Sequence, residues 1–230
     1  MKISIITLFP KMISGFFKES IVKRAQEKKL VEIELINLRD FAIDDYGTVD
    51  DRPYGGGAGM ILRIEPIYEA LRKVKTTTQS SKVKTIITSP KGKKFNQEKA
   101  TEFSKLNHLI IVSGHYEGVD ERVIDYVDEE VSLGNFIMTG GEIAAAAIVD
   151  STVRLLSGVL KKDGVIKNES FNIQGKKLLE YPQYTRPAVF KGKKAPKILL
   201  SGNLKKIEDW RLKKALEETK KKRKDLLSRL

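Results

Sequence analysis

The sequence predicts an α/β fold with a parallel sheet, followed by a small, mostly helical C-terminal domain. Over the first 160 residues, short β-branched runs alternate with helical stretches, which is the pattern of βαβ units with right-handed crossovers. Two of the runs, "KTIITS" and "HLIIVS", are almost continuously apolar, as expected of strands buried on both faces of a parallel sheet. Beyond them, a basic segment with prolines changes into a helical pattern.

Strands and helices are expected in alternation along the first domain. The strands are expected at residues 3–9, 32–37, 83–88, 108–113 and 130–133, and the helices at 10–28, 65–73, 96–106 and 142–156. The glycine cluster "DDRPYGGGAGM" (50–60) follows no long strand. It indicates a long loop whose glycines permit positive φ and close backbone approach, or simply a flexible surface loop.

Two domains joined by a linker are expected. We place the first domain at residues 1–160, the linker at 161–177 and the second domain at 178–230. The linker segment "KKDGVIKNESFNIQGKK" has few apolar residues and no clear period. In the second domain, Ile207, Trp210, Leu212 and Leu216 are spaced to face a core.

The composition excludes several classes of chemistry. The 230 residues include no cysteine and two histidines, so disulfides, thiolate zinc sites and cysteine nucleophiles are excluded. No apolar run approaches the roughly 20 residues of a membrane span. The start "MKISIITLFPKM" alternates like a strand and is not typical of a signal peptide. We therefore expect a cytoplasmic protein that does not associate with membranes.

The chain is strongly basic, with 43 lysines and arginines against 30 acidic residues and a net charge of +13. Such an excess favours a polyanionic partner, nucleic acid first. General enrichment in lysine is the alternative. A large share of the excess lies in residues 205–230.

Three of the later expected strands each end in a turn-rich loop. These loops are "TSPKG" (88–92), "SGHYEG" (113–118) and "LGNFIMTGG" (133–141). Ligands of open parallel sheets bind beyond the carboxyl ends of the strands. Three such loops in series therefore predict one pocket with a wall rich in backbone groups.

The 133–141 loop has the composition of an adenine site. It matches neither G-x-x-x-x-G-K-[ST] nor G-x-G-x-x-G, which argues against nucleoside triphosphates and ordinary dinucleotides. Gly134, Asn135, Gly140 and Gly141 surround an apolar middle, so the loop offers backbone hydrogen bonds together with an apolar surface. That combination suits an adenine ring; a tight strand-to-helix connection is the alternative.

The motif "SGHYEGVDERV" (113–123) combines a glycine turn with Tyr116, Glu117 and further charged residues. A carboxylate here can orient an amine or a sulfonium of a ligand, although acidic residues also favour a helix N-terminus. Arg154 lies among apolar neighbours, where an arginine either pairs structurally or stabilises negative charge on a substrate oxygen. Glu169, taken alone, is an ordinary solvated linker carboxylate.

Taken together, these motifs resemble the bacterial tRNA (guanine-N1)-methyltransferases of the SPOUT superfamily. The segments "ITLFP", "DDRPYGGGAGM", "SGHYEGVDERV", "LGNFIMTGGE", "YPQYTRP" and "LLSGN…I..WR" occur in order over nearly the whole chain. The resemblance implies methylation of N1 of guanosine 37 in tRNA, next to the anticodon, with S-adenosylmethionine as methyl donor. It also implies a deep trefoil knot in the first domain, a rare exception to unthreaded topology.

The resemblance further implies a homodimer with shared active sites and a C-terminal helical domain that binds the anticodon stem-loop of tRNA. It leaves open whether a magnesium ion assists, and it names no metal ligands. The implied cofactor-binding residues are Ser89, Pro90, Gly114, Tyr116, Glu117, Ser132, Leu133, Gly134, Asn135, Phe136, Ile137, Met138, Gly140 and Gly141.

Two implied catalytic residues complete the expected site. Arg154 matches the active-site arginine of the family, and Glu169 stands where the family has its proposed general base, an aspartate immediately before "SF". Glutamate keeps the carboxylate but is one methylene longer.

Three other functions stay open at the level of sequence. A non-catalytic RNA-binding protein would share the basic charge but would not bind S-adenosylmethionine. A nucleotide-dependent α/β enzyme lacks support because there is no phosphate-loop lysine and no acidic metal cluster in the sequence. A methyltransferase for another RNA position is the third alternative.

Overall fold

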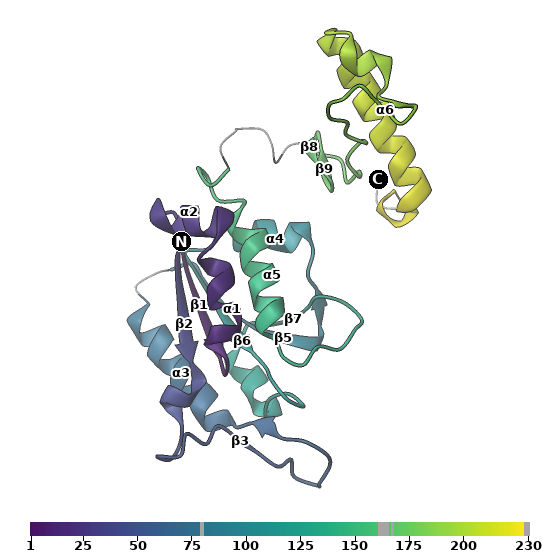
Figure 1. Cartoon of the computed structure of the whole chain (residues 1–230). Coiled ribbons are helices and arrows are strands. Elements are labelled where there is room, and N and C mark those ends of the chain that lie inside the picture. Colours follow the sequence, from purple (N-terminus) through teal and green to yellow (C-terminus); the bar gives the residue numbers. More distant parts are fainter. Residues whose placement is uncertain (79–80, 161–165, 167, 228–230) are drawn as a thin grey trace. The chain divides into compact units, whose positions relative to one another are not determined.

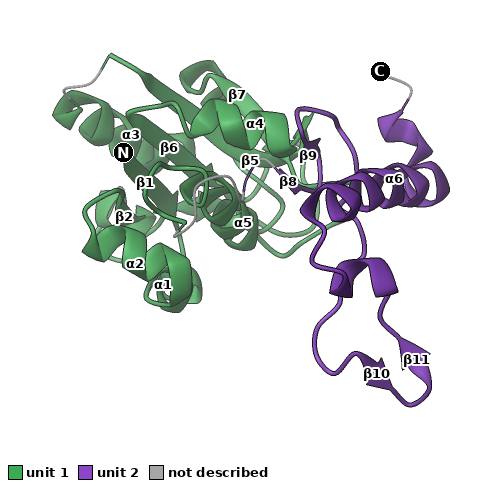
Figure 2. Cartoon of the chain, turned by 90° about the horizontal axis from the view of Figure 1, so that it is seen from above, with its two compact units in different colours: residues 1–161 green, residues 162–230 purple. Residues whose placement is uncertain are grey.

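Residues 1–78, 81–160, 166 and 168–227 are described by the computed structural model of the chain. The chain divides into two compact units, Met1–Lys161 and Lys162–Leu230 (Figures 1 and 2). Within the expected linker, residues 161–165 and 167 lie outside the described residues.

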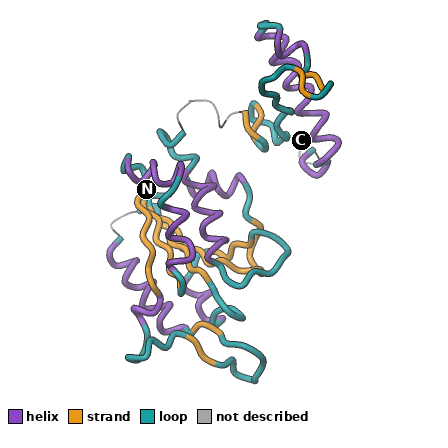
Figure 3. The backbone as a smooth tube through the Cα atoms, viewed as in Figure 1, coloured by secondary structure: helices purple, strands orange, loops and turns teal. Residues whose placement is uncertain are grey.

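Unit 1 contains a five-stranded sheet in the order β2-β1-β6-β5-β7, with every neighbouring pair parallel. Figure 3 shows the strands in orange between the purple helices. The strands of this sheet are β1 (Lys2–Thr7), β2 (Glu32–Asn37), β5 (Val83–Lys94), β6 (His108–Ser113) and β7 (Glu129–Ser132). All six residues of β6 are buried, because this continuously apolar run lies in the middle of the sheet. The predicted α/β class with a parallel sheet is confirmed.

Helices cover both faces of this sheet. The helices α1 (Pro10–Phe17), α2 (Ser20–Glu27), α4 (Gln97–Phe103) and α5 (Glu142–Val153) pack on one hydrophobic core. The helix α3 (Ile64–Thr77), with the short 3-10 helices η1 (Leu38–Phe41) and η2 (Glu121–Tyr126), packs on the other. Alternate residues of β1 separate the two cores, with Ile3 and Ile5 on the first face and Ile6 on the second.

The expectation of one helix over residues 10–28 is wrong. The chain forms α1 and α2 with a break between them, where Glu19 is extended (φ −125°, ψ 161°). The side-chain amide of Gln26 donates to the carbonyl of Phe17 at 2.7 Å, which satisfies a carbonyl that the break frees. The break lets Phe17 of α1 and Val22 of α2 reach the same core.

The expectation that a loop follows residue 88 is also wrong. Strand β5 continues to Lys94, and its pairing with β7 resumes at Lys93 after an irregularity that begins at Thr88. Gly92 permits this second pairing, because a Cβ there would lie under 3.0 Å from the backbone of Glu130. The segment 89–92 is therefore a bulge inside a long strand, a feature common beside functional sites.

The glycine cluster at 50–60 forms the turn of a small hairpin. Residues 52–60 connect the antiparallel strands β3 (Asp50–Asp51) and β4 (Ile61–Leu62). The amide of Glu117 donates to the carbonyl of Met60 at 3.1 Å, and the amide of Leu62 donates to the carbonyl of Gly118 at 2.9 Å. These bonds hold the end of the hairpin against the 113–118 loop.

Unit 2 is built around one long helix. Its elements are β8 (Asn168–Glu169), β9 (Asn172–Ile173), β10 (Val189–Phe190), β11 (Lys193–Lys194), η4 (Lys197–Leu200), α6 (Leu204–Lys222) and η5 (Lys224–Leu226). A small core contains Ile173, Leu178 and Ala215, with Leu212 packed against it. Of the positions expected to face a core, Ile207 is buried but Leu216 is exposed. In the part of the chain that the structure describes, no helix is long and apolar enough to cross a membrane.

Candidate active site

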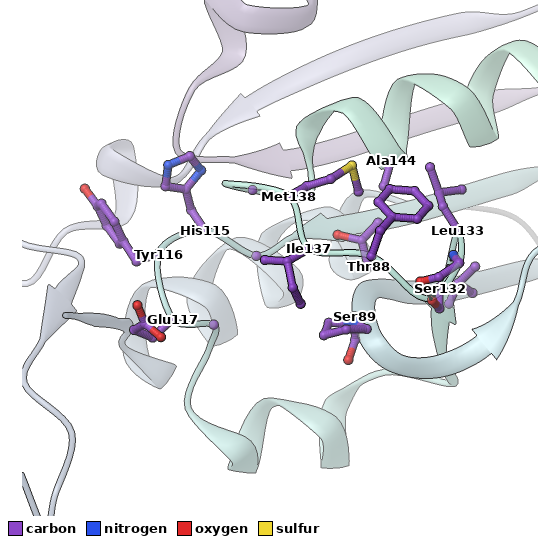
Figure 4. Close-up of a pocket in the computed structure, with 18 residues that line it drawn as sticks. Thr88, Ser89, His115, Tyr116, Glu117, Ser132, Leu133, Ile137, Met138 and Ala144 are labelled. Atoms are coloured by element: carbon purple, nitrogen blue, oxygen red, sulfur yellow. Dashed lines mark hydrogen bonds between the residues drawn. The ribbon is translucent and has the colours of Figure 1, made fainter. Parts of the chain in front are cut away.

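Three segments at one end of the sheet of unit 1 meet around a cavity of about 230 Å³ (Figure 4). The bulge of β5, the 113–118 loop after β6 and the 132–141 segment after β7 each contribute to its lining. The cavity thus lies at the carboxyl ends of parallel strands, where open α/β sheets bind their ligands.

The structure brings nearly all of the expected cofactor-binding residues together. All of them except Asn135 line the cavity. The structure adds five lining residues that the sequence did not single out as ligand contacts: Thr88, His115, Gly118, Val131 and Ala144. His115 lies inside the "SGHYEG" motif, so its position next to the expected ligands was the available signal. Thr88 likewise lies inside the "TSPKG" loop. Ala144 carries no such signal, because only the folded chain brings it to the wall.

Two glycines let the 132–141 segment cross the neighbouring loops closely. The amide of Gly141 donates to the carbonyl of Gly114 at 2.7 Å, and Gly140 pairs with His115 in an antiparallel bridge. A Cβ on Gly141 would lie under 3.0 Å from Thr88 Oγ1, and one on Gly140 equally close to the His115 ring. Any side chain at these positions would push the three segments apart.

The wall of the cavity combines apolar side chains with fixed backbone groups. Ile137 is 85% exposed and Phe136 is 55% exposed, so the middle of the loop offers an open apolar surface. The Ser132 hydroxyl donates to the carbonyl of Gly134 and accepts from its amide, both at 3.2 Å, which holds the turn. In Figure 4, Ile137 and Met138 lie between the 113–118 loop and Leu133. A flat heteroaromatic ring suits such a surface.

Glu117 is the carboxylate of the 113–123 motif that lines the cavity. Asp120 and Glu121 are instead held by cations. Arg122 Nη2 lies 2.7 Å from Asp120 Oδ2, and this hydrogen bond lowers the pKa of Asp120. Lys91 Nζ lies 2.8 Å from Glu121 Oε2, which raises the pKa of Lys91. Of the three carboxylates Glu117, Asp120 and Glu121, Glu117 is therefore the one that a ligand in the cavity can contact.

Neither of the two expected catalytic residues is among the lining residues. Arg154 follows α5, with its amide donating to the carbonyl of Asp150 at 3.2 Å. Since α5 begins at the cavity and rises 1.5 Å per residue, Arg154 stands about 20 Å further along the helix axis than Gly141. Glu169 lies in unit 2, in strand β8, where it pairs with Asn172. Within the described ranges, no cluster of three or more acidic, histidine or cysteine side chains is placed to hold a metal ion.

A parallel α/β sheet with a backbone-rich, partly apolar cavity at the carboxyl ends of its strands is typical of proteins that bind a small molecule there. Residues 1–229 match the family model described as tRNA (Guanine-1)-methyltransferase TrmD. The chain belongs to this family, and the resemblance seen in its motifs is confirmed.

Curated proteins named tRNA (guanine-N(1)-)-methyltransferase are similar over nearly their whole length. The protein of Clostridium botulinum (strain Eklund 17B / Type B) is 52% identical over 226 residues, covering 98% of this chain and 92% of that protein. The protein of Dictyoglomus turgidum is 52% identical over 229 residues, covering 100% of this chain and 91% of its own. That of Geobacillus kaustophilus is 51% identical over 228 residues, with 99% and 91% covered.

Proposed function

We propose that this chain is an enzyme that methylates N1 of guanosine 37 in tRNA, with S-adenosylmethionine as methyl donor. The observation that carries the proposal is the full-length family match, since curated relatives at about half identity are named for methylation of guanine N1 in tRNA. The cavity supports it independently, because its chemistry fits the cofactor.

The lining residues fit S-adenosylmethionine in three respects. The open apolar surface of Phe136 and Ile137 suits the faces of an adenine ring, and the backbone of the 132–141 segment suits its polar edge. The Glu117 carboxylate suits an amine or sulfonium. Gly140 and Gly141 allow close backbone approach. When bound, the cofactor supplies an electrophilic methyl group on a sulfonium.

The catalytic roles are assigned to Glu169 and Arg154. Guanine N1 carries a proton and is a poor nucleophile until that proton leaves. The Glu169 carboxylate accepts this proton as general base, a role that typically contributes about 10² to 10⁴-fold in rate. The Arg154 guanidinium stabilises the negative charge that develops on guanine O6. The target base leaves its stack to reach the cavity.

A deep trefoil knot in the first domain is part of the proposal. The chain leaves the edge strand β7 and returns to the middle of the sheet, where α5 packs against β1 and β6. On the way it passes the 113–118 loop at the Gly141–Gly114 hydrogen bond. This close crossing supports a threaded path.

A homodimer with shared active sites is also part of the proposal, and the position of Arg154 supports it. An arginine side chain cannot span the roughly 20 Å along α5 to the cavity of its own chain. We therefore assign Arg154 to the site of a second copy. The exposed apolar side chains of Met12 and Phe16 on α1 and Ile143 on α5 supply a patch for such a contact.

The C-terminal domain, residues 178–230, is assigned to tRNA binding, with 1–160 as the methyltransferase domain and 161–177 as linker. Lysines are concentrated in unit 2, including Lys220, Lys221 and Lys222 in the last turn of α6. Lysines at these positions bind phosphates without reading sequence. We assign no residues to a magnesium ion.

The proposal is tested by separating binding from catalysis. The variant Glu169→Gln keeps the size of the side chain but cannot accept a proton, so methyl transfer should fall by about 10² to 10⁴-fold. Its affinity for S-adenosylmethionine, measured by calorimetry, should equal that of the wild type. The matched variant Glu169→Asp should retain most of the activity. Turnover of Glu169→Gln near the wild-type rate would show that another group is the base.

A further inference from the structure

The first residue of α5, Glu142, carries a carboxylate that is 0% exposed. Its Oε1 accepts a hydrogen bond from Thr7 Oγ1 at 2.9 Å, and its Oε2 lies 3.2 Å from His115 Nδ1. The Thr7 hydroxyl is the donor in the first contact, and His115 Nδ1 is the hydrogen-bond partner in the second. A carboxylate buried this deeply is tolerated only because it is paired in this way.

This carboxylate connects three elements that are distant in sequence. Thr7 is the last residue of β1, His115 lies in the loop after β6, and Glu142 begins α5. The network continues on both sides. The Thr7 hydroxyl accepts from the amide of Phe9 at 3.0 Å, and the Phe9 ring packs on the His115 ring at 4.6 Å between centroids.

The network ends at the wall of the cavity without Glu142 being part of that wall. His115 lines the cavity and forms a backbone bridge with Gly140. The space beside Gly140 is filled by the His115 ring and the Glu142 carboxylate, since a Cβ there would lie under 3.0 Å from both. This pair therefore fills the space between the 113–118 loop and Gly140, beside the backbone hydrogen bond from Gly141 to Gly114.

We propose that Glu142 is a positioning residue that fixes the cofactor wall through Thr7 and His115. Its loss leaves the reacting groups in place but loosens the 113–118 loop against the 140–141 crossing, which weakens cofactor binding. This inference rests on the proposed function in one respect, namely that the cavity holds S-adenosylmethionine. The role does not require Glu142 to touch the cofactor.

The test compares Thr7→Val, which removes one hydroxyl at constant volume, with Thr7→Ser, which keeps it. The matched control is Thr152→Val on α5, because the Thr152 hydroxyl is also fully buried yet has no hydrogen-bond partner among the described residues. Thr7→Val removes the hydrogen bonds of this hydroxyl to Glu142 and to the Phe9 amide, and Glu142→Gln changes the acceptor of the first. Each should raise the Kd for S-adenosylmethionine about tenfold. Thr7→Ser and Thr152→Val should bind like the wild type.

Two further readouts separate positioning from catalysis and from general destabilisation. At saturating cofactor, the kcat of Thr7→Val should stay within about twofold of the wild type, since the reacting groups are unchanged. Hydrogen exchange of the ligand-free protein should speed up at the Gly141 amide in Thr7→Val and not in Thr152→Val. If Glu142→Gln does not fold, His115→Asn takes its place in the comparison, because that side chain is partly exposed.

Unchanged cofactor affinity and unchanged exchange in folded Thr7→Val and Glu142→Gln would overturn the inference. A fall in kcat at unchanged Kd would overturn it as well, because the network would then act in the chemical step. Failure of the wild type itself to bind S-adenosylmethionine would instead contradict the proposed function, and with it the inference that depends on it.

Discussion

At the residue scale, Gly141 leaves no room for a side chain. A Cβ there would lie under 3.0 Å from Thr88 Oγ1. Gly141→Ala should therefore separate the crossing segments and weaken S-adenosylmethionine binding at least 100-fold, measured by calorimetry. The matched control is Gly15→Ala inside α1, where a Cβ would meet nothing within 4 Å. That variant should be stabilised by about 0.5–1 kcal/mol. Equal cofactor affinities of the two variants would contradict a tight crossing.

His108 makes the stability of unit 1 depend on pH. The ring is 2% exposed, and its two nitrogens lie 2.9 Å from the hydroxyls of Ser4 and Thr78. Burial, with a smaller contribution from Lys2, lowers the pKa of His108 below its ordinary value of 6.5, against an opposing effect of Glu34. At pH values between the lowered pKa of folded His108 and 6.5, the unfolded chain binds more protons than the folded chain. The contribution of the neutral His108 ring to the stability of unit 1 is therefore complete above pH 6.5 and is lost as the pH falls.

The expected result is a free energy of unfolding that falls between pH 7 and pH 5, by about 1.4 kcal/mol for each unit by which the pKa is lowered. Urea unfolding at a series of pH values measures it. In His108→Gln, which is neutral throughout, this part of the pH dependence should disappear. An unchanged pH slope in that variant would assign the effect to other groups.

The candidate site was predictable from the sequence where it is made of consecutive residues. Turn-rich segments at strand ends indicated the cavity, and nearly all of the 132–141 wall was expected. The contacts of Glu142 were not predictable, because Thr7 and His115 lie 135 and 27 residues away in the chain. The direction of a side chain in a loop could not be predicted from the sequence either, which is why Asn135 was expected in the lining but does not belong to it.

At the element scale, the bounds of β6 and the start of β5 were predictable, because burial on both faces leaves an unambiguous apolar pattern. The break between α1 and α2 was not, since it contains neither proline nor glycine and is set by the packing of Phe17 and Val22. The extension of β5 was hidden by Pro90 and Gly92, which ordinarily end a strand but here occupy a bulge.

The hairpin β10–β11 is a candidate contact for tRNA. Phe190 is 62% exposed next to Val189, with Lys191 at the turn and Lys193 and Lys194 on the second strand. Exposed aromatic rings beside lysines bind single-stranded nucleotides by stacking and charge, at about 1–3 kcal/mol per stacked base. Phe190→Ala should weaken tRNA binding about five- to tenfold in a fluorescence anisotropy titration. Its affinity for S-adenosylmethionine should not change, and an unchanged tRNA affinity would remove the hairpin from the interface.

At the scale of the whole molecule, the net charge of +13 predicts strong dependence of tRNA binding on salt. Each phosphate contact releases counterions, so six to ten contacts reduce affinity by about 10³ to 10⁵-fold between 50 and 200 mM salt. A titration of labelled tRNA at several salt concentrations measures the slope. Binding of S-adenosylmethionine should change little over the same range. A flat salt dependence for tRNA would exclude a binding surface built on lysine.

The most direct test of the central proposal is methyl transfer to defined tRNA. Two transcripts that differ only at position 37, guanosine in one and adenosine in the other, are incubated with the wild-type protein and labelled S-adenosylmethionine. Digestion and mass spectrometry then locate the methyl group. We expect N1-methylguanosine at position 37 of the first transcript and no label in the second. Methylation of another nucleotide, equal labelling of both transcripts or no transfer to either would contradict the proposed function.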